Sequence, residues 1–97
     1  MERMSHMEFE QGNNRFYKEK DGKLIAEVTY VPQGDSVAID HTFVDPSLRG
    51  QGIAEQLVDR VVEEMQKEQM KVLAVCPYVV ELFKRKPDKY EHIIANP

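Results

Sequence analysis

Residues 49–54 read Arg-Gly-Gln-Gly-Ile-Ala and separate a segment of predicted β-strands from the one long amphipathic helix that the sequence predicts. A strand that leads through a glycine-rich turn into a helix is a common phosphate-binding arrangement. The first turn of a helix has unpaired N–H groups and carries the positive end of the helix dipole. No Ser, Thr, Asp or Asn immediately precedes the predicted helix to cap it. The pattern therefore indicates either an anion site or a turn whose glycines serve only its conformation.

Two well-known phosphate motifs do not fit this turn. A dinucleotide fingerprint requires a third glycine three residues after Gly52, where the chain has Glu55. A P-loop requires Gly-Lys-Ser or Gly-Lys-Thr, which the sequence lacks. An anion held here would therefore be bound by a different motif.

The composition limits the classes of function. A chain of 97 residues forms one domain with one core. The net charge of −4 and the lack of a basic cluster argue against nucleic acid as a partner. A single cysteine excludes an internal disulfide, and no long apolar run indicates a membrane span or signal peptide, so we expect a cytoplasmic protein. The histidines and the cysteine lack the spacing of metal ligands, so no metal is expected.

Alternating apolar residues and turn signals predict a meander of antiparallel strands before the glycine-rich turn. Asp21-Gly22 favours a two-residue hairpin turn. The predicted strands span residues 8–11, 15–19, 24–31, 36–44 and 71–75. The last of these is a continuous apolar run, as is typical of a central parallel strand. Residues 1–7 contain three methionines and are expected to be disordered or an added N-terminal segment, which leaves residues 8–97 as a single domain.

Two helices are predicted after the meander. The longer one, residues 51–69, has an apolar stripe at helical spacing that predicts contact with the core. Pro77 suits the first position of a second, short helix, which Pro87 ends. Positive residues 84–86 suit the C-terminal end of that helix, and we interpret them as a helix end. The predicted fold class is α+β, with a mixed, mainly antiparallel sheet of about five strands, a parallel pair bracketing the long helix, and a short C-terminal helix.

The glycine-rich turn resembles the acetyl-CoA signature of the GNAT superfamily of N-acetyltransferases, Gln/Arg-x-x-Gly-x-Gly/Ala. The chain reads Arg49-x-x-Gly52-x-Ala54 and fills every fixed position. The resemblance runs from about residue 23 to residue 90. It extends to a short single-domain branch in which Asp-His-Thr precedes the turn and Cys-Pro-Tyr follows the next strand, as residues 40–42 and 76–78 do here.

The resemblance implies a GNAT-like fold in which the strand before the turn carries a β-bulge and is splayed from its parallel neighbour. Acetyl-CoA would lie in the gap, with its pantetheine arm on strand backbone and its diphosphate on the N–H groups of the turn. The implied cofactor-binding residues are Phe43, Val44, Arg49, Gly50, Gln51, Gly52, Ile53 and Ala54.

The same resemblance places the acetyl group near His41 and Cys76. Histidine titrates near neutral pH, so His41 is either a general base or a packed strand histidine. Asp40 is a candidate to orient an incoming ammonium, although neighbouring strand residues point to opposite faces unless a bulge lies there. Cys76 begins a helix, a position that favours the thiolate. It is therefore a nucleophile, an acid to the departing CoA thiolate, a thiol that pairs with CoA, or an inert buried cysteine.

Two departures from the family pattern keep alternatives open. Many GNAT enzymes use a tyrosine as acid where this chain has Phe83, and Tyr78 lies a turn earlier. The helices and last strands that commonly form the acceptor pocket are missing. The sequence predicts acetyl transfer from acetyl-CoA to an unidentified amine, small or macromolecular. The alternatives are a non-catalytic CoA-binding module that acts as a sensor or interaction domain, and an α+β interaction domain whose match is accidental.

Overall fold

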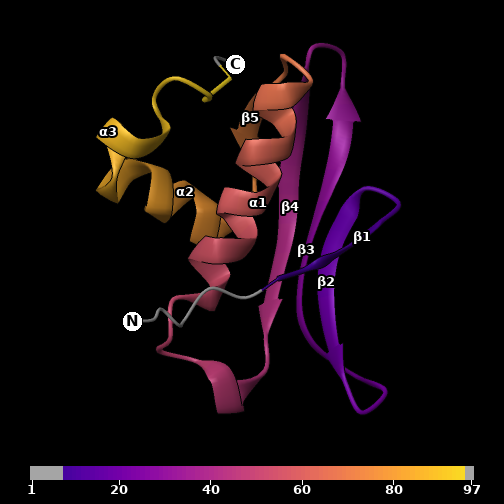
Figure 1. Cartoon of the computed structure of the whole chain (residues 1–97). Coiled ribbons are helices and arrows are strands. Elements are labelled where there is room, and N and C mark those ends of the chain that lie inside the picture. The colour runs from indigo at the N-terminus through magenta and orange to yellow at the C-terminus, as the bar shows by residue number, and fades with distance from the viewer. Residues whose placement is uncertain (1–7, 96–97) are drawn as a thin grey trace, which may run out of the picture.

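The computed structural model describes residues 8–95 as a sheet with its helices on one face (Figure 1). The elements, in order, are β1 (Glu10–Gly12), β2 (Arg15–Lys20), β3 (Lys23–Gln33), β4 (Ser36–Val44), η1 (Pro46–Leu48), α1 (Ile53–Lys67), β5 (Lys71–Ala74), α2 (Pro77–Arg85) and α3 (Pro87–Tyr90). The expectation for residues 1–7 lies outside the described residues.

The strands form one five-stranded sheet in the order β1-β2-β3-β4-β5. The first four strands pair antiparallel, and β5 pairs parallel with β4. Asp21 and Gly22 both have positive φ, 54° and 79°, as a two-residue hairpin turn with the right-handed twist of its strands requires. The α+β fold with a mixed, mainly antiparallel sheet is therefore confirmed.

The core lies between the sheet and the helices. The stripe of α1 is buried, with Leu57, Val58 and Val61 fully inaccessible to solvent. It packs in one cluster with buried sheet residues such as Val28 and with the apolar face of α2. Burial of each such aliphatic side chain contributes about 1.5–3 kcal/mol. The helices thus share one face of the sheet, and the residues described provide no helix for the other face (Figure 1).

The ends of the elements differ from the prediction in one respect that matters for function. The long helix begins at Ile53 instead of residue 51, because Gly52 has φ 75° and ψ 15°, a left-handed conformation outside the helical region. Near the C-terminal end of the described residues, Ile93 is buried and Ile94 forms a parallel bridge with Val72, so this segment packs against β5.

Candidate functional site

A pocket of about 190 Å³ lies at the N-terminal end of α1. The glycine-rich turn and the end of β4 form most of its wall, and α2 closes it. The lining residues are Val44, Leu48, Arg49, Gly50, Gly52, Ile53, Ala54 and Tyr78. Six of the eight residues expected to bind the cofactor are therefore brought together, while Phe43 and Gln51 are not in the lining.

The first turn of α1 opens beside this pocket. Gly52 is the N-cap residue and provides no side chain, and the first i→i−4 bond is donated by Gln56 N to Gly52 O at 3.1 Å. The preceding N–H groups lie at the positive end of the helix dipole. Gly50 also has a positive φ, 83°, so the backbone turns without a side chain at either glycine. The turn can present N–H groups to an anion.

Asp45 anchors the start of the turn. Its Oδ2 accepts hydrogen bonds from Ser47 N at 3.1 Å and from Ser47 Oγ at 2.5 Å, which caps η1. Lys23 Nζ lies 3.3 Å from Oδ1. The hydrogen bonds from Ser47, followed by Lys23, lower the pKa of Asp45 below its ordinary value. Sequence reasoning missed this capping role, for which Asp followed by Pro and Ser was the available signal.

The parallel strands separate beside the same pocket. Their ladder runs from Ser36 and Lys71 to Ile39 and Ala74. It ends where Val75 N and Cys76 N both donate to Ile39 O, at 3.1 and 2.9 Å. β4 continues to Val44, and among residues 8–95 no strand pairs with this last part of its edge on the side of β5. The edge therefore offers backbone groups to an extended ligand.

A β-bulge lies in β4 at Asp40. His41 pairs with Thr29, and Ile39 pairs with the next residue, Tyr30, so Asp40 is the extra residue. Asp40 Oδ1 accepts a hydrogen bond from Thr29 Oγ1 at 2.7 Å. Because Thr29 and His41 are cross-strand partners, Asp40 and His41 lie on the same face of the sheet, the face without helices.

The His41 ring lies on this face beside Glu27. Its Nε2 is 3.9 Å from Glu27 Oε1, and the His41 side chain is 55% exposed. Glu27 also accepts a hydrogen bond from Arg15 Nε at 2.6 Å. His41 is therefore reachable from solvent and has a carboxylate neighbour.

Cys76 lies on the other face. It is 8% exposed and is the N-cap residue of α2. Its Sγ is 3.5 Å from Thr42 Oγ1, so that the two side chains share a hydrogen bond. Thr42 follows His41 on β4 and points to the opposite face, where it pairs with the buried Val28. The structure thus joins Cys76 to Thr42 and separates it from His41. Thr42 was missed as a site residue, although the Asp-His-Thr and Cys-Pro-Tyr motifs contain both partners.

The two aromatic positions considered for the acid have different surroundings. Tyr78 lines the pocket, and burial, followed by the charge of Glu55, raises the pKa of its hydroxyl. Phe83 is 6% exposed and packs against Tyr90, with ring centroids 4.8 Å apart. Of the two, Tyr78 is the residue at the pocket, and Phe83 belongs to the core.

Two negative findings apply to the described part of the chain. Residues 8–95 contain no group of three or more His, Cys, Asp or Glu side chains arranged to hold a metal ion. None of the helices described is both long and apolar enough to cross a membrane.

Comparison with solved structures finds the same fold in acetyltransferases. A proposed GCN5-like N-acetyltransferase from Staphylococcus aureus, solved by NMR, is 32% identical, with a TM-score of 0.76 over 97% of this chain and 93% of that one. An acetyltransferase from Clostridium acetobutylicum, assigned by prediction and crystallised with acetyl-CoA, is 20% identical, with a TM-score of 0.57 over 73% of this chain and 54% of that one. The ribosomal-protein-S18-alanine N-acetyltransferase from Escherichia coli is 23% identical, with a TM-score of 0.54 over 64% of this chain and 42% of that one.

The sequence comparisons give the family. No curated protein matches the chain significantly. The family profile described as GCN5-related N-acetyl-transferase matches residues 15–93, which include every strand from β2 to β5, the glycine-rich turn and all the helices described. The chain belongs to the GCN5-related N-acetyltransferase family, the GNAT superfamily that the turn at residues 49–54 resembles.

Proposed function

We propose that this protein transfers an acetyl group from acetyl-CoA to an amine. The observation that carries the proposal is the pocket formed by the turn at residues 49–54, at a helix N-terminus without a side-chain cap, beside the unpaired end of β4. Acetyl-CoA is a thioester that carries a diphosphate and an extended arm with amide groups, and each of these can bind a different part of this surface. The N–H groups and the positive end of α1 suit the diphosphate, and the edge of β4 suits the arm.

The cofactor-binding residues act mainly through their backbone in this proposal. Phe43 and Val44 offer the strand edge to the pantetheine amides, as an added strand would use it. Gln51 and the glycines offer the turn to the diphosphate. Arg49 contributes a charge at the pocket wall, where its Nε donates to Val44 O at 3.4 Å. A ligand amide that reached Val44 O would compete with Arg49 for this oxygen.

The amine approaches from the face of the sheet without helices. An ammonium must lose a proton before nitrogen can attack the thioester carbon, and His41 is the base proposed to take it. Asp40, on the same face through the bulge, orients the ammonium. This face is open, and Val31 and Val75 are 44% and 52% exposed. The open face suits an acceptor amine on a peptide or protein as well as a small amine.

Direct attack accounts for every bond. The amine nitrogen bonds to the acetyl carbon, the carbon–sulfur bond breaks, and the electron pair leaves with the CoA sulfur. The nitrogen loses two protons: His41 takes the first from the ammonium and releases it to solvent, and then takes the second once the nitrogen–carbon bond has formed. The CoA thiolate takes a proton from Cys76, which lies on the face that carries Thr42 and regains a proton from solvent after turnover. Tyr78 at the pocket wall is the alternative acid.

Calorimetry with acetyl-CoA, followed by a thiol-release screen over amines and peptides, tests this function. We expect acetyl-CoA to bind and at least one amine class to be acetylated. No binding at millimolar acetyl-CoA would overturn the proposal altogether. Binding without transfer to any amine would leave a CoA-binding module in place of an enzyme.

A further inference from the structure

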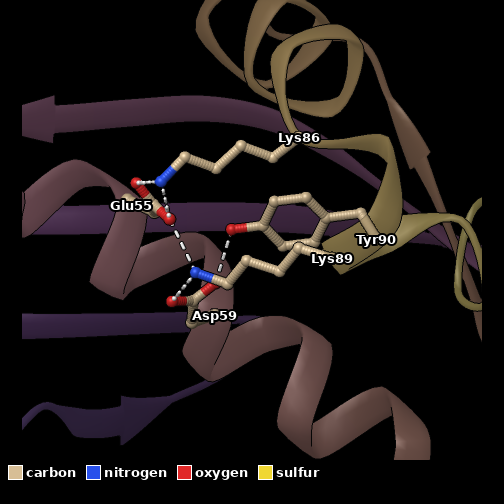
Figure 2. Close-up of polar contacts among 5 residues, drawn as sticks. All are labelled: Glu55, Asp59, Lys86, Lys89 and Tyr90. Carbon is tan, nitrogen blue, oxygen red and sulfur yellow. Dashed lines mark hydrogen bonds and ion pairs between the residues drawn. The ribbon is translucent and has the colours of Figure 1, made fainter.

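A network of charges connects the first turn of α1 to the C-terminal part of the chain (Figure 2). Glu55 accepts hydrogen bonds from Lys86 Nζ at 3.0 and 2.9 Å, and from Lys89 Nζ at 2.6 Å. Lys89 also donates to Asp59 Oδ2 at 3.0 Å, and Tyr90 OH donates to Asp59 Oδ1 at 2.6 Å. Two carboxylates one turn apart on α1 are therefore held by residues at the end of α2 and on α3.

Glu55 places this network of charges next to the pocket. Glu55 is the acidic residue in the first turn of α1 and directly follows Ala54, which lines the pocket. Its charge reaches the pocket wall, where it contributes to the raised pKa of Tyr78. A carboxylate suits a helix N-terminus when nothing else binds there, but it opposes an anionic ligand at the same N-terminus.

The lysines cancel this charge. The Glu55 side chain is only 21% exposed, so solvent screens it incompletely, and each of its oxygens has an ammonium partner. Burial works against ionisation of Glu55, and the hydrogen bonds from Lys89 and Lys86 outweigh it to lower the pKa of the carboxyl. Glu55 therefore stays ionised, and Lys86 and Lys89 neutralise it from the side of α3.

We propose that Lys86 and Lys89 are positioning residues for the diphosphate of acetyl-CoA, because they neutralise Glu55 and hold the first turn of α1 ready for an anion. This inference rests on the proposed function. It assigns a role to Lys86, which the sequence alone indicated only as part of the positive helix end at residues 84–86, and to Lys89 on α3. Neither lysine needs to touch the ligand.

The test compares CoA with pantetheine, which lacks phosphate, by NMR titration of the full chain. Replacement of both lysines by Met keeps their apolar stems and removes the charges. We expect this double variant to bind CoA roughly tenfold more weakly at low salt, with a smaller loss at high salt, and to bind pantetheine as the wild type does. Lys84→Met is the matched control, because Lys84 pairs only loosely with Glu81 at 3.9 Å and is 71% exposed.

Glu55→Gln separates charge compensation from structural support. If the lysines act through charge, Glu55→Gln alone binds CoA at least as tightly as the wild type, and in the double variant it restores most of the lost affinity. If the network only supports α1, Glu55→Gln weakens CoA and pantetheine binding together, which overturns the inference. An equal loss of affinity for CoA and for pantetheine in the double variant would also overturn the inference. Failure of the wild type to bind CoA would instead refute the proposed function.

Discussion

Thr42 Oγ1 and Cys76 Sγ lie 3.5 Å apart and join β4 to the N-terminus of α2 at the level where the parallel strands separate. The ladder between β4 and β5 ends at Ile39. Beyond that point, the contact between Thr42 and Cys76 connects β4 to the start of α2. A thioester placed in the gap would meet the thiol and the hydroxyl together. In the proposed mechanism, the pair therefore influences how the CoA sulfur leaves.

Replacement of Cys76 should impair the chemical step while donor binding persists. Loss of a general acid lowers turnover by roughly a hundredfold or more, so we expect kcat of Cys76→Ala to fall on that scale while KM for acetyl-CoA changes little. Cys76→Ser, which keeps a proton donor beside Thr42, should retain more activity. Steady-state kinetics with an amine found in the screen measures both variants.

Mass spectrometry of the intact protein with acetyl-CoA provides the companion measurement. Direct attack predicts no covalent acetyl group on the wild type. An acetyl adduct that disappears in Cys76→Ala would show transfer through Cys76 and contradict the direct route.

His41 is expected to act in proton removal from the amine. His41→Ala should lower kcat at neutral pH by roughly a hundredfold, and the loss should shrink at higher pH, where more of the amine is already neutral. The affinity for acetyl-CoA should not change. The measurement is the pH dependence of kcat, with calorimetry for the donor.

His92→Ala is the matched control for His41. His92 is also exposed, but its Nε2 contacts Gln66 near the end of α1, far in sequence from the bulge. It should keep full activity. Unchanged turnover in His41→Ala would remove His41 from the mechanism.

The order and type of the elements could be predicted because local signals agree with the packing. Asp21-Gly22 specifies a hairpin, the stripe from Ile53 to Met65 specifies a buried helix face, and Pro77 and Pro87 delimit α2. Most of the residues that line the pocket at the start of α1 were predictable for the same reason, since the turn at residues 49–54 is continuous in sequence.

The rest depends on contacts between distant residues. The contact of Thr42 with Cys76 spans 34 positions, and that of Lys89 with Glu55 also spans 34. The bulge at Asp40 is set by the register of β4 against β3, which one strand's sequence does not specify. For this reason sequence reasoning left open whether Asp40 and His41 share a face, and it did not identify Glu55 or its lysine partners.

Gly52→Ala should weaken both the fold and the binding of CoA. A new Cβ meets no atom within 4 Å, so the cost comes from the backbone conformation, φ 75°, and is about 1 kcal/mol. Any relaxation of φ moves the first turn of α1 and its N–H groups, so CoA affinity should also fall. Chemical denaturation and calorimetry measure the two effects.

Gly34→Ala is the matched control for Gly52→Ala. Gly34 also has a positive φ, 63°, and open space around its Cβ position, but it lies in the turn between β3 and β4. It should destabilise the protein to a similar extent and leave CoA affinity unchanged. A fall in CoA affinity with Gly34→Ala would show that loss of stability alone explains both results.

Tyr90→Phe should destabilise the protein by about 1 kcal/mol, because it removes the hydrogen bond to Asp59 from a residue that is only 1% exposed. Burial, followed by Asp59, raises the pKa of Tyr90 above its ordinary value of 10.0. The stability that this hydroxyl contributes is fully present below pH 10 and is lost as the pH rises further. The difference in unfolding free energy between wild type and variant should therefore narrow above pH 10, and a difference that stays constant there would contradict this account.

Asp45→Asn should make the protein less stable at neutral pH and less sensitive to acid. The hydrogen bonds from Ser47 and the charge of Lys23 lower the pKa of Asp45 in the folded chain below its ordinary value of 3.8. Its contribution is fully present above pH 3.8 and declines as the pH falls through the lower, folded value. Urea denaturation between pH 7 and pH 3 should show the free energies of unfolding of wild type and variant converging at the acid end.

Asp88→Asn is the control for Asp45→Asn, because Asp88 is an exposed carboxylate in the first turn of α3. If the unfolding free energies of the two variants depend on pH in the same way, the hydrogen bonds that Asp45 accepts from Ser47 do not stabilise the turn that leads into the pocket.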